Sequence, residues 1–347
     1  MKGRSSLVGD RIELLDESLV TRFPEIAMEV LAGSARLKIP LGWHYLLDLT
    51  WLLSEASAPE GSVVLDAGAG LGLMQFLLAE RGYRVISADM EIRKPSADLT
   101  TLYQFKTIGS TGEIAHDYLD HRGAARTPTV SHAIQNKAKS LLDTPPREWI
   151  GRFFRRPSAT SGAAHGPNPA AQPNLTKPHD LPPRPTIELL RCNLESMPEV
   201  ADASVDAVVS VSALEHNRPE EVKRIVRELQ RVLKPGGAML HTISACREGI
   251  SHHEPSHSWL LDEAGIIDAY DLRRPESNFD RFDEVFESLR QSRYLRRWLS
   301  AFYYRGGKNG MPWGVWDPQY QPVGVRREMP AAAPVASQNA SAAPRGV

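Results

Sequence analysis

Residues 64–73 read VLDAGAGLGL, and this stretch decides the fold. An apolar run comes first, and glycines then recur at every second position, at Gly68, Gly70 and Gly72. Glycine permits a positive φ and lacks the Cβ atom that would keep a ligand away from the backbone. A strand that ends in such a turn predicts a site where main chain approaches a ligand closely.

Strand-like and helix-like segments alternate around this turn. A strand over Ser62–Leu65 leads into it, a helix is expected over Leu73–Arg81, and Arg84–Ala88 is expected to be the next strand, ending at Asp89. The alternation returns after residue 186, where four further strands and an amphipathic helix are expected: Ile187–Cys192, Val205–Val211, Ala238–Ser244 and Gln321–Arg327, with the helix over Glu220–Leu233. This order predicts an α/β fold, with a Rossmann-like, doubly wound and mostly parallel sheet.

The domain organisation follows from where this alternation stops. We expect an N-terminal helical segment over 1–56, helical from residue 11 onward, then the α/β domain over 57–329 with an insertion at 92–186, and a flexible tail over 330–347. Residues 156–186 are rich in Pro, Ala, Gly and Ser and contain few large apolar side chains. Because such a segment cannot bury enough surface to offset its ordering entropy, we expect it to be disordered.

Composition excludes several classes of protein. The chain carries 41 Lys and Arg against 42 Asp and Glu, which provides no overall electrostatic attraction for nucleic acid. Its two cysteines have no paired or metal-type spacing, and no apolar run reaches the length of a membrane span. We therefore expect a cytoplasmic protein with no membrane span and no nucleic-acid partner.

Four blocks of the sequence occur in an order and spacing that resemble the motifs of class I S-adenosylmethionine-dependent methyltransferases, in their small-molecule branch. They are VLDAGAGLG, ISADM, CNLESMPEVADASVDAVVSVSALEH and ELQRVLKPGGAMLHTIS, and the resemblance covers residues 43–90 and 187–245. It implies that S-adenosyl-L-methionine is the cofactor. It also implies the residues that bind the cofactor: Asp66, Gly68, Ala69, Gly70 and Gly72 around its methionine and ribose, Asp89 with Met90 at the ribose hydroxyls, Asn193 and Leu194 against adenine, and Ser210 facing the reacting methyl group.

The sequence departs from the family at two points. Many relatives carry Asp where this chain has Asn193, although an amide carbonyl can still accept a hydrogen bond from the adenine amino group. The insertion between the expected second and third strands is unusually long, and the resemblance does not cover it.

Methyl transfer to oxygen needs a group that removes the acceptor's proton, and histidine titrates in the right range. His216 follows the expected fourth strand, near whose end the acceptor should lie, and it is the first candidate for a general base. Its alternative role is a local hydrogen bond to a backbone carbonyl of a loop. His253 and His257, after the fifth strand, are the second candidates.

These two histidines also form the string His253-Glu254-Pro255-Ser256-His257, which matches the H-E-x-x-H pattern of zinc proteases. Zinc chemistry would need both histidines one turn apart on a single helix face. Pro255 disfavours a helix through the residue before it, and we expect it to open a helix that continues to Leu261. The sequence therefore predicts no metal site.

The leading hypothesis is a methyltransferase that acts on a small-molecule, lipid or sugar-containing acceptor, at oxygen. A nucleic-acid or protein methyltransferase is the alternative enzyme, although SVSALEH lacks the Asn/Asp-Pro-Pro-Tyr string that holds a flipped base. A non-catalytic protein of the same fold would have no need of the glycine turn with Asp66 and Asp89. A dehydrogenase fits the glycine spacing less well.

Overall fold

The computed structural model describes residues 9–91, 93–109, 116–117, 184–296 and 316–331. Within them one sheet runs in the order β12-β1-β13-β9-β8-β2-β3-β7-β5. Its strands are β1 (Arg11–Leu14), β2 (Val63–Ala67), β3 (Arg84–Asp89), β5 (Gln104–Ile108), β7 (Thr186–Arg191), β8 (Val205–Val211), β9 (Leu233–Ala245), β12 (Glu276–Ser277) and β13 (Gln321–Glu328). A hairpin of β10 (Ile250–His253) and β11 (Ser258–Leu261) joins β9, and β4 (Arg93–Lys94) pairs with β6 (His116–Asp117) in a separate small sheet.

The direction of the strands confirms the predicted fold class. Strand β2 lies between β3 and β8 and is parallel to both, and the parallel pairing continues outward to β7 and β5 on one side and to β9 on the other. The chain thus leaves β2 in one direction and later returns to its other side. Such a reversal of strand order opens a crevice at the carboxyl ends of the strands, where α/β proteins bind their ligands.

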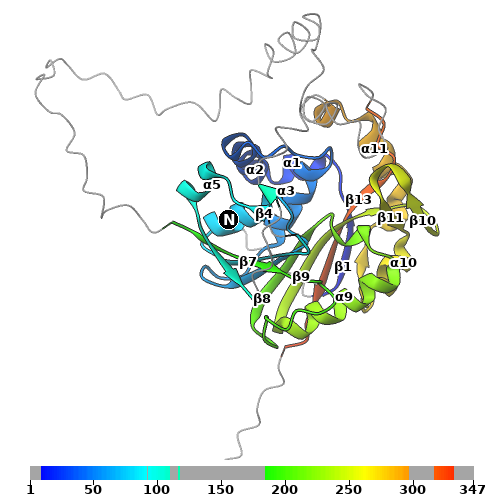
Figure 1. Cartoon of the computed structure of the whole chain (residues 1–347). Coiled ribbons are helices and arrows are strands. Elements are labelled where there is room, and N and C mark those ends of the chain that lie inside the picture. Colours follow the sequence, from blue (N-terminus) through cyan, green and yellow to red (C-terminus); the bar gives the residue numbers. More distant parts are fainter. Residues whose placement is uncertain (1–8, 92, 110–115, 118–183, 297–315, 332–347) are drawn as a thin grey trace, which may run out of the picture.

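Helices cover both faces of the sheet, as Figure 1 shows. The helices are α1 (Ser18–Arg22), α2 (Pro24–Leu37), α3 (Tyr45–Glu55), α4 (Met74–Glu80), α5 (Ala97–Leu102), α9 (Pro219–Val232), α10 (Glu263–Ala269) and α11 (Phe282–Gln291), with short 3₁₀ turns η1 (Leu214–His216), η2 (Glu254–Ser256) and η3 (Phe279–Arg281). Helices α2, α3 and α4 pack into one apolar cluster and α9 and α10 into a second. Neighbouring residues of a strand serve opposite clusters, as Val64 and Leu65 do. Among the described residues, no helix is both long and apolar enough to cross a bilayer.

Two expectations about local structure are wrong. Residues 11–14 form strand β1 and not the start of a helix; their side chains alternate between half-buried and buried, and β1 pairs antiparallel with β13 and parallel with β12. Residues 255–261 do not form a helix either. A single 3₁₀ turn is followed by a left-handed residue, His257 (φ 53°), and by strand β11, which pairs with β10.

The region expected to be an insertion begins inside the sheet layer. Helix α5 is capped by the Ser96 side chain, and β5 pairs parallel with β7 as an edge strand, so residues 97–108 extend the sheet. Residues 118–183, which include most of the segment expected to be disordered, lie outside the described residues. So does most of the expected tail.

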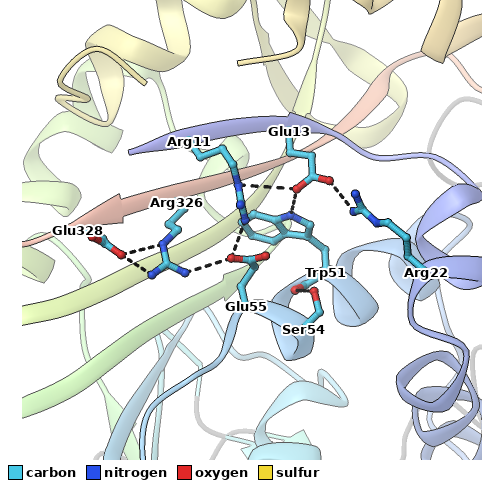
Figure 2. Close-up of polar contacts among 8 residues, drawn as sticks. All are labelled: Arg11, Glu13, Arg22, Trp51, Ser54, Glu55, Arg326 and Glu328. Carbon is cyan, nitrogen blue, oxygen red and sulfur yellow. Dashed lines mark hydrogen bonds and ion pairs between the residues drawn. The ribbon is translucent and has the colours of Figure 1, made fainter. Parts of the chain in front are cut away.

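The two ends of the described chain meet beside α3, in a polar network drawn in Figure 2. Glu55 of α3 lies 2.6 Å from Arg11 of β1 and 3.0 Å from Arg326 of β13. The Trp51 indole donates a hydrogen bond of 2.8 Å to Glu13. These contacts anchor α3 to the antiparallel pair that β1 and β13 form.

Trp51 also packs against the backbone of β13. A Cβ atom at Gly324 would lie 2.4 Å from the Trp51 ring, so only glycine allows the indole to approach this closely. The position of α3 over the sheet therefore depends on residues near both ends of the sequence.

Candidate functional site

The predicted glycine turn follows β2 at the carboxyl edge of the sheet. Gly68 has φ 72°, and a Cβ there would lie 2.5 Å from the Cβ of Ala213, which follows the next strand over, β8. Gly70 has φ 47°, and a Cβ built on it meets little besides Asp89 Oδ2 at 3.9 Å. Gly68 thus allows the ends of β2 and β8 to approach each other closely, and Gly70 leaves open space over the turn. Buried Gln75 braces the turn by donating to the Gly72 carbonyl at 3.0 Å.

A cavity of about 690 Å³ opens beside this turn, within the size range of small-molecule sites. Its described lining residues come from the α2–α3 loop, α3, the glycine turn, and the ends of β3, β7 and β8: Ile39, Pro40, Leu41, Tyr45, Leu49, Asp66, Gly68, Ala69, Gly70, Leu71, Gly72, Leu73, Met74, Asp89, Met90, Asn193, Leu194, Val211, Ser212, Ala213, His216 and Asn217, with Ile225 of α9. All but one of the predicted cofactor-binding residues therefore lie around one cavity.

Asp66 is the most unusual of them. Its side chain is only 1% exposed, and within the described part of the chain neither carboxylate oxygen has a hydrogen-bond partner. Burial, with a smaller contribution from the charge of Asp89, raises the pKa of Asp66 to about 7, and the Gln75 backbone offsets part of this rise. A buried acceptor group without a partner costs free energy unless a ligand supplies a donor.

Asp89, at the end of β3, is held in place before any ligand arrives. Its Oδ2 accepts from the Gly70 amide at 2.8 Å and its Oδ1 from the Glu91 amide at 3.0 Å. Each carboxylate oxygen has a second lone pair, so both can still accept one hydrogen bond from a ligand. Met90 beside it is exposed and lines the cavity.

Asn193 lies at the end of β7 and lines the cavity with Leu194. Its Oδ1 accepts from the Glu195 amide at 3.0 Å, which closes a tight turn. Toward a ligand the side chain therefore presents its NH₂ group and one remaining lone pair of the carbonyl.

The resemblance places Ser210–Ser212, at the end of β8, beside the reacting methyl group, and the later part of this segment lines the cavity. Ser210 is fully buried and does not line the cavity, whereas Ser212, two residues further on, does. Ser212 has φ 44°, a left-handed conformation that is unfavourable for residues other than glycine.

Of the three predicted histidines, His216 lines the cavity, and His253 and His257 do not. His216 of η1 lines the cavity, and its Nδ1 lies 3.1 Å from the His257 carbonyl oxygen. A carbonyl can only accept, so Nδ1 carries a proton, and in the neutral ring Nε2 has the free lone pair that a base needs. His257 thus reaches the site through its backbone, not through its ring.

His253, at the end of β10, lies outside the cavity lining. Its Nδ1 is 2.6 Å from Ser256 Oγ, and its ring packs edge-on against Tyr320 with centroids 5.4 Å apart. Burial lowers its pKa, and the neighbouring His252 lowers it further. Because the two histidines of the H-E-x-x-H string stand on a hairpin, they do not share a helix face. Among the described residues, no cluster of three or more His, Cys, Asp or Glu is arranged to hold a metal ion.

Sequence reasoning missed the wall of the cavity that α3 provides. Tyr45 and Leu49 line it, and buried Asp48 stands between them on the same helix. The sequence signal was present, since Asp48 is the single acid within the apolar run YLLDLTWLL and follows His44 by four residues. A lone carboxylate at a buried helical position needs a partner, and a histidine one turn earlier can supply it.

A model of the methyltransferase-domain family matches residues 167–241, which include β7, β8, α9 and the first part of β9. The match supports the resemblance to class I S-adenosylmethionine-dependent methyltransferases that the sequence motifs indicate. S-adenosyl-L-methionine is accordingly its cofactor. The unpartnered oxygens of Asp66, the two remaining lone pairs of Asp89 and the open space over Gly70 fit this molecule, which carries an ammonium group, ribose hydroxyls and a sulfonium.

Solved structures similar to this chain include a protein from Pyrococcus horikoshii (17% identity, TM-score 0.28), an S-adenosylmethionine-dependent methyltransferase from Methanosarcina mazei (16%, 0.31) and the [4+2]-cyclase SpnF (15%, 0.41). The matches cover 67%, 62% and 90% of this chain and 64%, 81% and 96% of those chains, so the chain spans less than two thirds of the Pyrococcus protein. None of the curated proteins compared with the chain matches it.

Proposed function

We propose that this methyltransferase transfers the methyl group of S-adenosylmethionine to an oxygen atom of a small, uncharged acceptor that enters the same cavity. Small molecules and lipid or sugar-containing compounds belong to this class. The observation that carries the proposal is the cavity itself, in which Asp66 offers two buried and unpartnered oxygens beside Asp89 and the glycine turn.

The described lining also suggests the kind of acceptor. Apolar side chains of the α2–α3 loop and α3 form one wall, and Ser212, His216 and Asn217 add polar groups to the lining. Among the described lining residues there is no Lys or Arg, so the wall offers no counter-charge to a phosphorylated or carboxylated acceptor. An uncharged molecule with a hydroxyl group fits these surroundings best.

The cofactor supplies an electrophilic methyl group on a sulfonium, which already has a good leaving group. The protein has to hold the acceptor in line with it, and positioning alone can contribute a large rate enhancement. Asp66 and Asp89 would receive the donor groups of the cofactor, and the Asn193–Leu194 turn would lie against adenine. His216 would accept the hydroxyl proton at Nε2, since its Nδ1 proton is engaged by the His257 carbonyl.

Two alternatives fit less well. A nucleic-acid methyltransferase needs cations along its substrate path, but the chain has a net charge of −1 and the described lining has no basic residue. A non-catalytic protein of this fold would gain stability by replacing Asp66, because an unpartnered buried carboxyl group is unfavourable without a ligand. A protein substrate remains the alternative that an assay must separate.

The test uses calorimetry and isotope transfer with the full chain. Wild type should bind S-adenosylhomocysteine, the demethylated product, and Gly70→Val should block binding because its side chain fills the open space over the turn. With S-adenosylmethionine labelled in the methyl group, label should enter the small-molecule fraction of a cell extract. Label that entered only the RNA or protein fraction would refute the proposed acceptor class, and a failure to bind either cofactor form would refute the function.

A further inference from the structure

A buried polar chain lies directly behind one wall of the cavity. Asp48 Oδ2 is 2.8 Å from His44 Nδ1 and 2.9 Å from Ser212 Oγ. The Asp48 side chain is fully buried, His44 is 3% exposed and Ser212 is 6% exposed. Of these three residues, only Ser212 lines the cavity. These hydrogen bonds connect α3 with the end of β8, two elements far apart in the sequence.

The chemistry of the three groups fixes where the protons lie. A carboxylate oxygen only accepts hydrogen bonds, so both His44 Nδ1 and Ser212 Oγ donate to Asp48. His44 Nε2 in turn faces the Tyr320 hydroxyl at 3.4 Å, and that hydroxyl accepts from the Trp43 indole at 3.2 Å. The Ser212 hydroxyl has no second proton. Toward a ligand its oxygen can therefore present lone pairs only.

The backbone at this serine supports a functional reading. Ser212 holds φ 44°, a left-handed conformation that is unfavourable for a residue other than glycine. Strained backbone of this kind is concentrated at ligand sites, where the surrounding structure enforces it. Here the enforcing contacts are the bond to Asp48 and a bond of 3.0 Å from the Ser212 amide to the Thr242 carbonyl.

We propose that Ser212, backed by Asp48 and His44, recognises an O–H or N–H group of the molecule that is methylated, other than the group that receives the methyl. This inference rests on the proposed function, and it deepens it by naming a feature of the acceptor. The acceptor must carry a second hydrogen-bond donor near the reacting oxygen, as a diol or a hydroxy amide does. His44 acts through Asp48 and is a positioning residue.

A fixed hydrogen-bond acceptor of this kind discriminates strongly between substrates. A site that is built to bind a substrate hydroxyl rejects an analogue that lacks it, because the buried polar atom is then left without a partner. Compounds with a lone hydroxyl should therefore be methylated much more slowly than compounds with two neighbouring donor groups.

The cofactor's own ammonium group is another donor that could reach Ser212, and the experiment has to separate it from the acceptor. Two probes serve for this purpose. S-adenosylhomocysteine carries the amino-acid part, whereas 5′-methylthioadenosine lacks it. If Ser212 served the ammonium group, Ser212→Ala would weaken S-adenosylhomocysteine binding at least fivefold and leave 5′-methylthioadenosine binding unchanged. That result would overturn the inference.

The expected result lies in the transfer assay, with methyl-labelled S-adenosylmethionine and with the small-molecule fraction of the extract as the acceptor source. For Ser212→Ala, the extract concentration that gives half-maximal labelling should rise at least tenfold, the maximal rate should stay within threefold, and S-adenosylhomocysteine affinity should be unchanged. Asp48→Asn keeps a carbonyl that can accept from Ser212, but it removes the charge and should produce a smaller rise in the same direction. His216→Asn should instead lower the maximal rate, so the two side chains can be told apart.

Ser244→Ala is the matched control. Ser244 is also buried and also donates to a buried carboxylate, at 3.2 Å to Glu215, but it does not line the cavity. Its loss should leave half-maximal labelling within twofold of wild type, and thermal unfolding should show that all variants are folded. If Ser212→Ala resembled Ser244→Ala, the inference would be wrong while the proposed function stood. If wild type itself labelled no small molecule, both would fall together.

Discussion

The two walls of the cavity are built in different ways. The glycine-turn wall, formed by residues 66–74 with Asp89 and Asn193, consists of short turns that each follow their own strand. The α3 wall, formed by residues 39–49 with residues 211–217, depends on a helix that is carried to the site by packing against β13. The first wall places main-chain atoms and carboxylates, and the second places side chains that were brought together from distant parts of the sequence. Local sequence patterns thus reveal the glycine-turn wall far better than the α3 wall.

The largest expected effect separates the two walls by function. His216→Asn removes the only group with a free basic nitrogen among the described cavity-lining residues, and general-base catalysis contributes about 10²–10⁴-fold. The transfer rate should fall by that order while S-adenosylhomocysteine affinity measured by calorimetry stays the same. His253→Asn tests the second candidate and should change the rate by less than threefold, because its ring packs on Tyr320. A mild His216 variant with an unchanged pH profile would mean that positioning alone accounts for the rate.

For Asp89→Ala we expect a loss of cofactor affinity, which His216→Asn should leave unchanged. Hydrogen bonds to a charged group contribute about 1.5–3 kcal/mol each, so losing the carboxylate should weaken cofactor binding by more than about tenfold. Asp89→Asn can still accept from the Gly70 amide and should lose less. Calorimetric titration with S-adenosylhomocysteine provides the measurement. Equal affinity in wild type and Asp89→Ala would remove Asp89 from the site.

A smaller effect is expected from the close approach of the two walls at Gly68. In Gly68→Ala, the left-handed φ costs about 1–2 kcal/mol and the new methyl group meets Ala213, so affinity should fall about tenfold and the melting temperature should drop. Gly61→Ala is the control, since Gly61 has φ 83° with nothing within 4 Å of its Cβ position. It should lose stability without losing affinity. Similar affinity losses in both variants would show that the contact between the walls is unimportant.

The smallest and most gradual effect is the pH dependence that Asp66 introduces. Its pKa is about 7 in the folded chain and about 4 when unfolded, so the unfolded chain releases this proton first as pH rises. Asp66 therefore lowers the free energy of unfolding progressively between about pH 4 and pH 7. In Asp66→Asn without ligand, thermal unfolding should show a gain in stability at pH 8 that disappears near pH 4.

The same carboxyl group should link cofactor binding to pH. A cationic ligand favours the ionised form, so the affinity of wild type for S-adenosylmethionine should increase as pH rises through 7, and that of Asp66→Asn should not. If calorimetry gave the same slope for both proteins, Asp66 would not be the titrating group.

The sequence predicted the sheet and the glycine-turn wall because both follow from short-range rules. Each of these rules can be applied to a window of about ten residues. They concern the apolar strands, the spacing of the glycines and the acid that ends β3. The α3 wall could not be predicted in this way. His44 and Asp48 were readable as a pair, but their place behind Ser212 depends on how α3 packs over the sheet, which includes the contact of Trp51 with Gly324.

The errors have the same origin. Residues 11–14 have no strand partner nearby in the sequence, since they pair with residues 323–326. The H-E-x-x-H string also acquires its hairpin from pairing between β10 and β11 rather than from the propensity of its own residues. Ser210 lies within β8, whereas Ser212 follows the strand in a left-handed conformation that strand alternation does not predict.

The meeting of both chain ends beside α3 has a consequence for biosynthesis. Strands β2, β3, β7, β8 and β9 are complete by residue 245, so a nascent chain can assemble the glycine-turn wall while the ribosome still holds the remainder. The α3 wall has to wait for β13, which is made some three hundred residues after β1. Contacts between such distant segments form slowly. During this interval the growing chain would present an apolar α3 without its partner strand, which is a surface that chaperones bind.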